Sequence, residues 1–448
     1  MSVAVNLIES FNSFFTDNIL SFFLLAAGII LTFKTGFVQI KFFNIGLKNT
    51  FRGLFSKEKS SGISAFQALM TSLAAQLGTG NIVGAGAAVI SGGPGAIFWM
   101  WVSAFFGMAT AYTEAYFAQK TRIKELNKEA FGGAPYYIKY AFKGKKGEFL
   151  SKTFSLFSLL SLGLTGIAVQ SNSISESLYE AMNIPLFLSG IILTTLSAAV
   201  ILKGTKAVAR LSSKAIPLFA LLYTLGCIAV ILVNIKKLPF AFSSIFSCAF
   251  SRSAFSGSIT GIAVKTAVTV GIKRGLFTNE AGMGSTPQAH ALAENVTPHF
   301  QGTLGMTGVT IDTFFMLTLT ALCVICVLYP NNAANYSALT GSEAVSLAFS
   351  TVFGQKGASV FIALSIFFFA FASILGWNIF GKSSAVFLFG EKSVMLYTLS
   401  SLLFVFLGCV FPGKLVWALT DLFNTCCVLT NVPALIKLSD KLEKPLNE

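Results

Sequence analysis

The sequence predicts an all-α membrane protein with about eleven transmembrane helices. Of its 448 residues, 54% are hydrophobic and only 11% are charged, and the mean hydropathy is +0.73, which excludes an ordinary soluble globular protein. Charge-poor runs of about 20 residues or more, the length that spans a bilayer as a helix, recur along the chain. Two of these runs are interrupted by glycines.

The predicted spans can be placed in chain order. The first covers 19–33, near the N-terminus. Residues 61–113 contain no Asp, Glu, Lys or Arg, and their length accommodates two helices joined by the turn Ser91-Gly92-Gly93-Pro94-Gly95. The later spans are expected at 153–175, 181–202, 215–235, 256–288, 313–342, 357–381, 393–413 and 415–436.

The net charge of +14 is explained by membrane topology and requires no nucleic-acid partner. When the loops are assigned alternately to the two sides, 23 Lys and Arg residues fall on one side and 5 on the other. The positive-inside rule then predicts an outside N-terminus and a cytoplasmic C-terminus. No basic residue precedes the first apolar run, so we expect that run to be a retained helix and not a cleaved signal peptide.

The two glycine interruptions predict broken helices. The first is Gly78-Thr79-Gly80-Asn81, and the second lies within 271–284, which contains four glycines. Close helix packing is the ordinary explanation of glycine in a membrane helix. Unwound backbone is tolerated at this depth only where it is buried in protein or lines a cavity. Two such interruptions in corresponding halves of a chain indicate the binding site of a secondary transporter.

Enzymatic and metal chemistry find no support in the sequence. The seven cysteines lie mostly in apolar segments, and the pair Cys323 and Cys326 has redox-motif spacing but no thioredoxin-like context. Two histidines cannot form a zinc site alone. No catalytic constellation has coherent spacing, so we predict neither an enzyme nor a resident cofactor.

Several stretches carry a family resemblance. They are Gly78-Thr79-Gly80-Asn81, the segment 92–101, the segment 274–285, and Ile374-Leu375-Gly376-Trp377. With these the chain resembles the alanine/glycine:cation symporter family, which comprises the sodium:alanine symporters and amino acid carrier proteins, over about 64–433. After Trp377 the family commonly has aromatic residues and a Glu-Arg pair, which this chain lacks, and the stretch 132–137 also differs slightly.

The resemblance implies a leucine-transporter-type fold. That fold has an inverted repeat of 5+5 helices with two broken helices, here preceded by one extra N-terminal helix. The chain would then divide into 1–60, an N-terminal helix and basic cytoplasmic loop; 61–240 and 254–437, the two five-helix repeats; and 438–448, a short cytoplasmic tail. The implied activity is sodium-driven import of small neutral amino acids, alanine and glycine, across the bacterial inner membrane.

A broken helix suits a zwitterionic substrate because it frees backbone groups of both signs. Amides of Gly80, Asn81 and Ile82 would face a carboxylate, and carbonyls from about 275–278 would face an ammonium group or Na⁺. Helix–helix hydrogen bonding and packing are the alternatives for the polar and aromatic members of the site. With the resemblance, the expected substrate-binding residues are Thr79, Gly80, Asn81, Gln170, Phe277, Thr278 and Trp377, with Phe277 and Trp377 as pocket walls.

Na⁺ is the expected coupling ion, and it is bound by oxygen atoms. The candidate ligands are the carbonyls of Ala74 and Leu77, the Asn81 side chain, and the hydroxyls of Thr278 and Ser373. Charged residues within the spans are functional candidates by default. For Glu280, capping of the break and ion coupling are both open, and Glu114 and Asp312 either pair with basic residues or line the inner vestibule, as gating or structural ions.

Other functions remain open at this point. A proton-coupled carrier or an exchanger of small amino acids is the principal alternative, and a channel or a membrane enzyme would need a continuous pore or a catalytic site. The sequence leaves open L- against D-alanine, glycine against serine, the ion stoichiometry and the oligomeric state.

Overall fold

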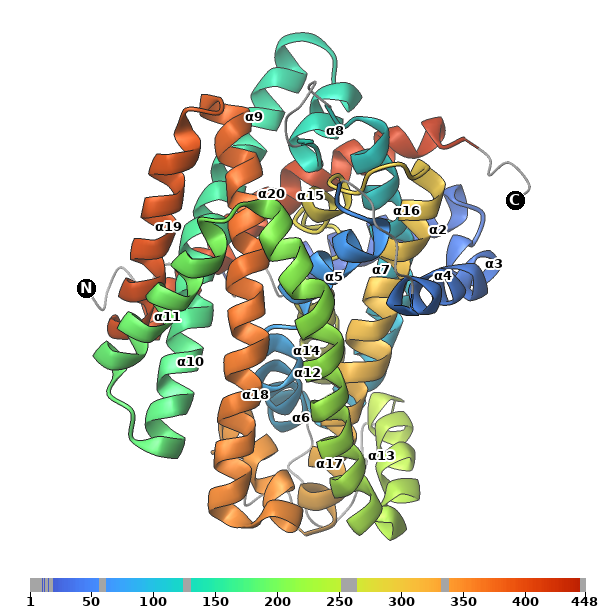
Figure 1. Ribbon diagram of the computed structural model, residues 1–448. Coiled ribbons are helices and arrows are strands. Elements are labelled where there is room, and N and C mark those ends of the chain that lie inside the picture. Colours follow the sequence, from blue (N-terminus) through green and yellow to red (C-terminus); the bar gives the residue numbers. More distant parts are fainter. Residues whose placement is uncertain are drawn as a thin grey trace.

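The computed structural model describes residues 19–55, 62–123, 130–250, 264–331 and 338–443, together with residues 10, 12 and 15. In this part of the chain the elements are helices, and no strand is formed beyond two isolated bridges (Figure 1). Seven helices of the described residues are long and apolar enough to cross a membrane, or eight with one bent pair. The multi-pass all-α class is therefore confirmed, whereas the count of eleven stays a prediction.

The helices that meet this length and hydropathy test are mostly longer than expected. They are α7 (Gly95–Lys120), α9 and α10 (Gly144–Leu160 and Ile167–Met182, joined by a π-helical segment), α12 (Thr205–Val233), α16 and α17 (Pro298–Val309 and Thr318–Leu328, likewise joined), α18 (Gly341–Phe389), α19 (Ser393–Val410) and α20 (Gly413–Leu438). Two shorter apolar helices are α2 (Ser21–Lys34) and α11 (Leu186–Ile201).

The remaining helices are short or lie next to the spans. They are α3 (Val38–Lys41), α4 (Phe43–Phe55), α8 (Ala134–Ala141), α13 (Leu238–Phe250), α14 (Val264–Asn279) and α15 (Pro287–His290). The first part of the span expected at 256–288 lies outside the described residues, and its described part is α14 together with the break after it.

One predicted boundary is wrong for an instructive reason. The span predicted at 313–342 begins after Asp312, because a charged residue interrupts the charge-poor run there. The structure instead carries a continuous helix from Pro298 to Leu328, with Asp312 fully buried inside it. A carboxylate can occupy the middle of a span where other helices supply hydrogen-bond donors, and hydropathy does not reveal those donors.

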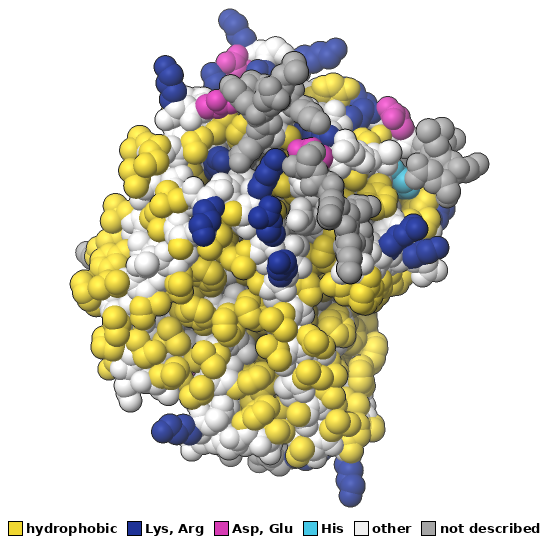
Figure 2. Space-filling view, viewed as in Figure 1, with side chains coloured by type: hydrophobic (Ala, Val, Ile, Leu, Met, Phe, Trp, Pro, Cys, Tyr) yellow, Lys and Arg dark blue, Asp and Glu magenta, His cyan; other side chains and the backbone are white. Residues whose placement is uncertain are grey.

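The outer surface divides into an apolar band and a basic end. Helix α12 exposes Leu218, Leu221, Leu222 and Leu225 by 50–55% each. Figure 2 shows such hydrophobic side chains covering most of the visible face, with Lys and Arg gathered over the end at which α8 and α9 lie in Figure 1. This arrangement matches an integral membrane protein, because leucine side chains are stable in contact with lipid hydrocarbon and cationic side chains favour the headgroup region.

The first predicted break is confirmed as a bend within the bundle. Helix α5 (Ala65–Gln76) begins with a capping box between Ser64 and Gln67, and a 3-10 turn (Thr79–Asn81) leads to α6 (Val83–Gly92). The two half-helices are bent by 59°. A Cβ at Gly78 would lie 2.8 Å from the Ser373 hydroxyl and 2.9 Å from the Gln170 amide nitrogen, so glycine lets these two polar side chains approach the turn.

The second break is longer and lacks a full second half-helix. After α14 ends at Asn279, three residues adopt positive φ: Glu280 (56°), Gly282 (91°) and Gly284 (75°). The next helix, α15, has only four residues before a further turn leads to α16. A left-handed backbone conformation is energetically unfavourable for a residue with a side chain such as Glu280. It persists only where contacts with the surrounding structure hold the residue in that conformation.

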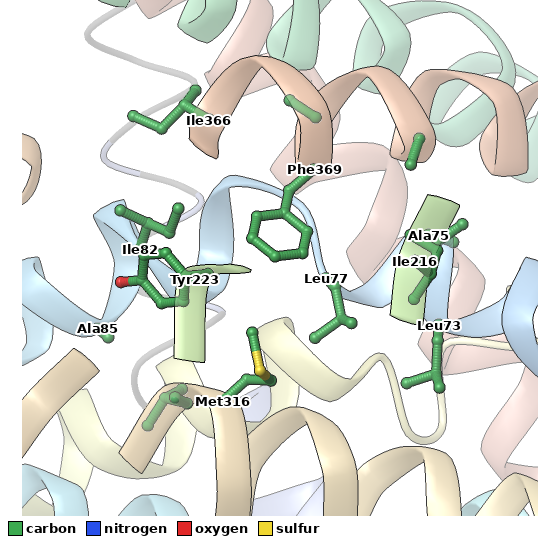
Figure 3. Packing of buried hydrophobic residues seen from close by; sticks show 14 of the residues in the cluster. Leu73, Ala75, Leu77, Ile82, Ala85, Ile216, Tyr223, Met316, Ile366 and Phe369 are labelled. Carbon is green, nitrogen blue, oxygen red and sulfur yellow. The ribbon is translucent and has the colours of Figure 1, made fainter. Parts of the chain in front are cut away.

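An apolar cluster surrounds the first break on one side. Tyr223 of α12 packs edge-on against Phe369 of α18, with ring centroids 5.9 Å apart, and its hydroxyl lies 2.8 Å from that of Thr320. Figure 3 shows Leu77 and Ile82, which flank the break, on either side of these rings. The bend is thus held between packed side chains.

Helices α6 and α18 approach each other through two glycines. A Cβ at Gly86 would lie 2.3 Å from the carbonyl oxygen of Gly341, and a Cβ at Gly341 would lie 2.0 Å from the carbonyl oxygen of Val83. By contrast, a Cβ at Gly84, one residue away from this contact face, would meet nothing within 4 Å. Small residues of this kind allow backbones to pack closely in membranes.

This contrast gives a matched prediction on stability. Gly86→Ala should destabilise the protein by about 1–3 kcal/mol, because the neighbouring backbone cannot yield without moving a helix. Gly84→Ala should be neutral, or stabilising by up to about 1 kcal/mol, because alanine favours helix. Thermal unfolding of both purified variants in detergent measures the difference, and equal midpoints would contradict the close approach of α6 and α18.

Candidate functional site

The two breaks lie against each other and form one junction, which we define as residues 76–82 and 278–285. A Cβ at Gly80 would lie 3.3 Å from the Thr278 side chain. The Gln76 side-chain amide donates a hydrogen bond of 2.7 Å to the carbonyl of Asn279. The freed ends of α5 and α14 therefore meet inside the bundle, where backbone groups have no water to bind.

Helices α10 and α18 bring polar side chains to the first break. The Gln170 carbonyl oxygen accepts a hydrogen bond of 3.4 Å from the amide of Thr79. The Ser373 hydroxyl lies 2.7 Å from the carbonyl oxygen of Ala74 and 3.3 Å from that of Ala75, to which it donates. The structure thus brings together most residues expected at the site: Ala74, Leu77, Thr79, Gly80, Asn81, Gln170, Thr278 and Ser373.

The closeness of α18 to α5 has a local cause in the sequence. A Cβ at Gly376 would lie 3.2 Å from the backbone nitrogen and the Cβ of Ala75, a tight contact that glycine avoids. Ser373 and Trp377 lie one turn apart on the same helix face. The segment Ile374-Leu375-Gly376-Trp377 therefore positions a hydroxyl and an indole at the junction.

Asp312 connects the first break to the span formed by α16 and α17. The Asn81 side-chain nitrogen donates to Asp312 at 2.6 Å, and the Thr313 hydroxyl donates to the other carboxylate oxygen at 2.8 Å. Asn279 donates to the Thr313 hydroxyl at 3.3 Å, which ties in the second break. Asp312 lies in a π-helical segment (Thr310–Leu317), a distortion frequent at functional sites.

Two oxygen atoms of this region have no hydrogen-bond partner among the described residues. They are Asn81 Oδ1 and Gln76 Oε1, on side chains that are 2% and 4% exposed. Buried polar atoms are nearly always satisfied, so each exception needs an explanation. Asn81 contacts the buried carboxylate of Asp312, so its oxygen is an atom that a cation could use.

Glu114 holds the second break in shape. Its two carboxylate oxygens accept from the amides of Gly282 (3.2 Å) and Gly284 (2.9 Å). Asn431 of α20 donates to Glu114 at 2.7 Å and to the carbonyl of Gly282 at 2.9 Å, and Tyr137 donates to Asn431 at 2.6 Å. From the sequence, Glu114 and Asp312 are expected either to pair with basic residues or to line the inner vestibule. Within the described part of the chain neither carboxylate makes an ion pair, so the first alternative is not observed there.

Glu280 joins the second break to α18. Its carboxylate accepts a hydrogen bond of 2.5 Å from the Ser285 hydroxyl and one of 3.0 Å from the Trp377 indole nitrogen. The indole also fills the space over Gly166, where a Cβ would lie 2.8 Å from the ring. Of the two roles left open for Glu280, these contacts support the structural one.

Phe277 lies away from the junction. Thr278 faces Gly80, and successive residues of a helix are rotated by about 100°, so Phe277 points elsewhere. It lines a small cavity of about 40 Å³ between α2, α14 and α20, together with Leu24, Lys273 and Asp421. The expectation that Phe277 and Trp377 form one pocket wall is not met by this structure.

Several residues of the site were missed by the sequence-based prediction. They are Gln76, Asn279, Thr313, Tyr137 and Asn431. The available signal was their polarity within apolar spans, which often marks helix–helix hydrogen bonds. That signal does not say which polar residues meet. Among the described residues no three His, Cys, Asp or Glu side chains gather at one point, and the seven cysteines are free.

Comparison with known proteins identifies relatives that match most of this chain. The chain is 36% identical over 436 residues to the sodium/alanine symporter AgcS of Methanococcus maripaludis, covering 97% of this chain and 95% of that protein. It is 34% identical over 429 residues to the probable sodium/glutamine symporter GlnT of Bacillus subtilis, covering 96% and 87%. A manganese transporter of Eremococcus coleocola has a similar fold, with a TM-score of 0.59 at 12% identity over 85% of this chain and 80% of that one.

The sequence profile of the sodium:alanine symporter family matches residues 1–448. Together with the full-length relatives, this match confirms the resemblance predicted from the segments around Asn81, Glu280 and Trp377. The chain belongs to the sodium:alanine symporter family, a family of transporters and not of enzymes.

Proposed function

We propose that the protein is a sodium-coupled symporter that imports small neutral amino acids, alanine and glycine, by alternating access across the bacterial inner membrane. The observation that carries the proposal is the junction, at which two helix breaks meet next to Gln170 and Ser373. Membership of the sodium:alanine symporter family and the name of AgcS support alanine and Na⁺ as transported species.

The first break suits the carboxylate of an amino acid. Amides of Gly80 and Asn81 lie in the 3-10 turn that precedes α6, where a helix N-terminus attracts an anion. The amide of Ile82, also expected to bind, instead closes the turn by donating to Thr79 at 3.3 Å. Gln170 and Trp377 contact the two breaks, and we expect these large side chains to limit the substrate side chain to a methyl group or hydrogen.

Two groups of oxygen atoms support binding of Na⁺. One combines the carbonyl of Ala74 with the hydroxyl of Ser373. The other combines Asp312 with Asn81. Rotation of the Asn81 side-chain amide by 180° would exchange its nitrogen and oxygen, which are similar in size, and would turn the oxygen toward a cation at Asp312. A cation shared by Asn81 and Asp312 would offset the carboxylate charge next to the substrate. The Thr278 hydroxyl donates a hydrogen bond of 2.7 Å to the backbone carbonyl of Arg274 within its own helix, and the lone pairs of that hydroxyl remain candidate Na⁺ ligands.

The proposed architecture is the leucine-transporter-type fold with eleven spans. Each break falls at the start of one half of the chain, α5–α12 and α14–α20, and α2 precedes both. In such a carrier, ligands shift an equilibrium between outward-open and inward-open states through their differential affinity. The fold likeness to a metal-ion transporter supports this class of architecture and says nothing about substrate.

A proton-coupled carrier is the second candidate, because Asp312 could carry a proton in place of binding Na⁺. The name of GlnT raises glutamine as a competing substrate. Neither alternative requires a different fold, so transport measurements must separate them.

The proposed function predicts saturable uptake of labelled alanine and glycine into proteoliposomes, driven by an inward Na⁺ gradient. Replacing Na⁺ by choline at fixed pH should abolish the uptake, and excess glutamine should compete poorly because Gln170 and Trp377 are expected to limit the substrate side chain. Uptake that follows a proton gradient and ignores Na⁺ would favour the second candidate, and uptake without saturation would favour a channel.

Asp312→Asn should weaken the binding of Na⁺ without unfolding the protein. Losing a charged partner costs about 1.5–3 kcal/mol, which corresponds to a roughly 10- to 150-fold rise in the Na⁺ concentration needed for alanine binding. Glu148→Gln, at an exposed site on α9, is the matched control and should change nothing. Equilibrium binding in detergent, titrating alanine at several Na⁺ concentrations, gives the answer, and an unchanged Na⁺ dependence in folded Asp312→Asn protein rules out the ligand role.

The orientation proposed from the charge asymmetry puts the basic end in the cytoplasm. A single cysteine replacing the exposed Lys145, in a variant without other cysteines, should react with impermeant thiol reagents only in inverted vesicles or permeabilised cells. Labelling in intact cells would reverse the assigned topology.

A further inference from the structure

A cavity of about 510 Å³ opens at the basic end of the molecule, away from the junction. It lies between α4, the start of α5, α12 and α16. The described residues that line it are Asn49, Arg52, Gly53, Leu54, Ser64, Ala65, Phe66, Gln67, Ser213, Lys214, Phe300 and Leu304. This space plays no part in the transport site described above.

The charged groups among the described lining residues of the cavity have one sign. Arg52 comes from α4 and Lys214 from α12, and no Asp or Glu is found among the described lining residues. Asn49 lines the same cavity and carries a side-chain amide donor, whereas the Ser213 hydroxyl donates within α12 to the carbonyl of Arg210 at 2.9 Å. Arginine and lysine from separate helices, with an amide donor in the same cavity, provide the chemistry that recognises a phosphate group.

The other half of the lining is apolar and continuous with the lipid-facing surface. Phe66, Phe300 and Leu54 contribute to the cavity wall. On α12, Lys214 lies between Leu211 and Leu218, one turn away on each side, which are 37% and 53% exposed.

Helix α4, which lines the cavity through Arg52, also carries exposed apolar side chains next to a cation. Phe51 is 61% exposed and Phe55 80% exposed, and they flank Arg52. On its inner side Gly46 packs so closely that a Cβ would lie 2.9 Å from the carbonyl oxygen of Thr303. A helix fixed to the bundle on one face, with aromatic and basic side chains on the other, is typical of the membrane interface.

We propose that this cavity binds an anionic phospholipid, with the headgroup phosphate between Arg52 and Lys214 and the acyl chains along the exposed leucines of α12. Apolar surface that begins within one turn of the cations favours a lipid over a free phosphate ion, which would need no such surface. The leaflet that supplies the lipid depends on the orientation proposed above. The proposed binding site does not depend on that orientation.

The position of the cavity gives the lipid a route to the transport cycle. Ser64 and Gln67, which form the capping box of α5, line it, and α5 carries Ala74 and Leu77 toward its other end. A lipid between α4, α5 and α12 would hold the start of the first half-helix against its neighbours. Bound lipid therefore stabilises the conformation in which these helices are arranged as they are here.

The test uses purified full-length protein and phosphatidylglycerol. Native mass spectrometry should detect phosphatidylglycerol retained more tightly than phosphatidylcholine, and Arg52→Gln with Lys214→Gln should weaken its binding by about 30-fold, because each cation near a membrane surface contributes about 1 kcal/mol. The matched control replaces Lys143 and Lys145 of the same end by Gln and should bind like the unaltered protein. All four side chains are exposed, so folding is expected to survive.

A second measurement separates the sources of the anion. Phosphatidylglycerol should raise the thermal midpoint of the unaltered protein but not of the Arg52/Lys214 variant, and inorganic phosphate at millimolar concentration should not reproduce the rise. An equal effect of lipid on both variants, or full reproduction by phosphate, would overturn the proposal. Loss of alanine transport with lipid binding intact would bear on the proposed function alone.

Discussion

Backbone groups freed inside a membrane protein must find partners within the protein, and this constraint organises the centre of the molecule. Each unsatisfied amide or carbonyl in a dry bundle is costly, because no water can replace the missing helix bond. The Glu114 carboxylate accepts hydrogen bonds from the amides of Gly282 and Gly284. The Gln170 side chain accepts from the amide of Thr79, and the Gln76 side chain donates to the carbonyl of Asn279. Helices far apart in sequence are therefore bound to the two breaks.

The same constraint explains why the buried carboxylates have no basic partners among the described residues. Glu114, Glu280 and Asp312 each accept from neutral donors supplied by another helix or turn. Ion pairs of the described residues lie instead at the surface, as between Lys120 and Glu443 at 2.7 Å, where the hydrogen bond from Lys120 holds the pKa of Glu443 below its usual range. Such exposed pairs contribute little to stability, whereas the carboxylates at the centre, with neutral donors alone, would remain available to the Na⁺ of the proposed function.

Glycine has two distinct uses around the junction. Gly282 and Gly284 adopt left-handed backbone, which the turn of the second break requires. Gly86, Gly341 and Gly376 are helical and instead allow helices to approach within backbone contact. The apolar cluster around Tyr223 and Phe369 then fills the space beside Leu77 and Ile82. A bend held by packing and hydrogen bonds, and not by a covalent constraint, can adopt a second arrangement when its ligands change.

The sequence by itself determined the class of the protein, the order of its helices, the two breaks and the family, because these depend on composition, glycine and local motifs. Only the tertiary structure decided which side chains meet. Asp312 lies inside a span because Asn81 and Thr313 donate hydrogen bonds to it, and hydropathy does not show those donors. Phe277, expected as a pocket wall, lines a cavity with residues of α2 and α20 because of the rotation of α14. Hydropathy records whether a residue prefers lipid or water, whereas the partner that makes a buried polar group tolerable lies on another helix, hundreds of residues away.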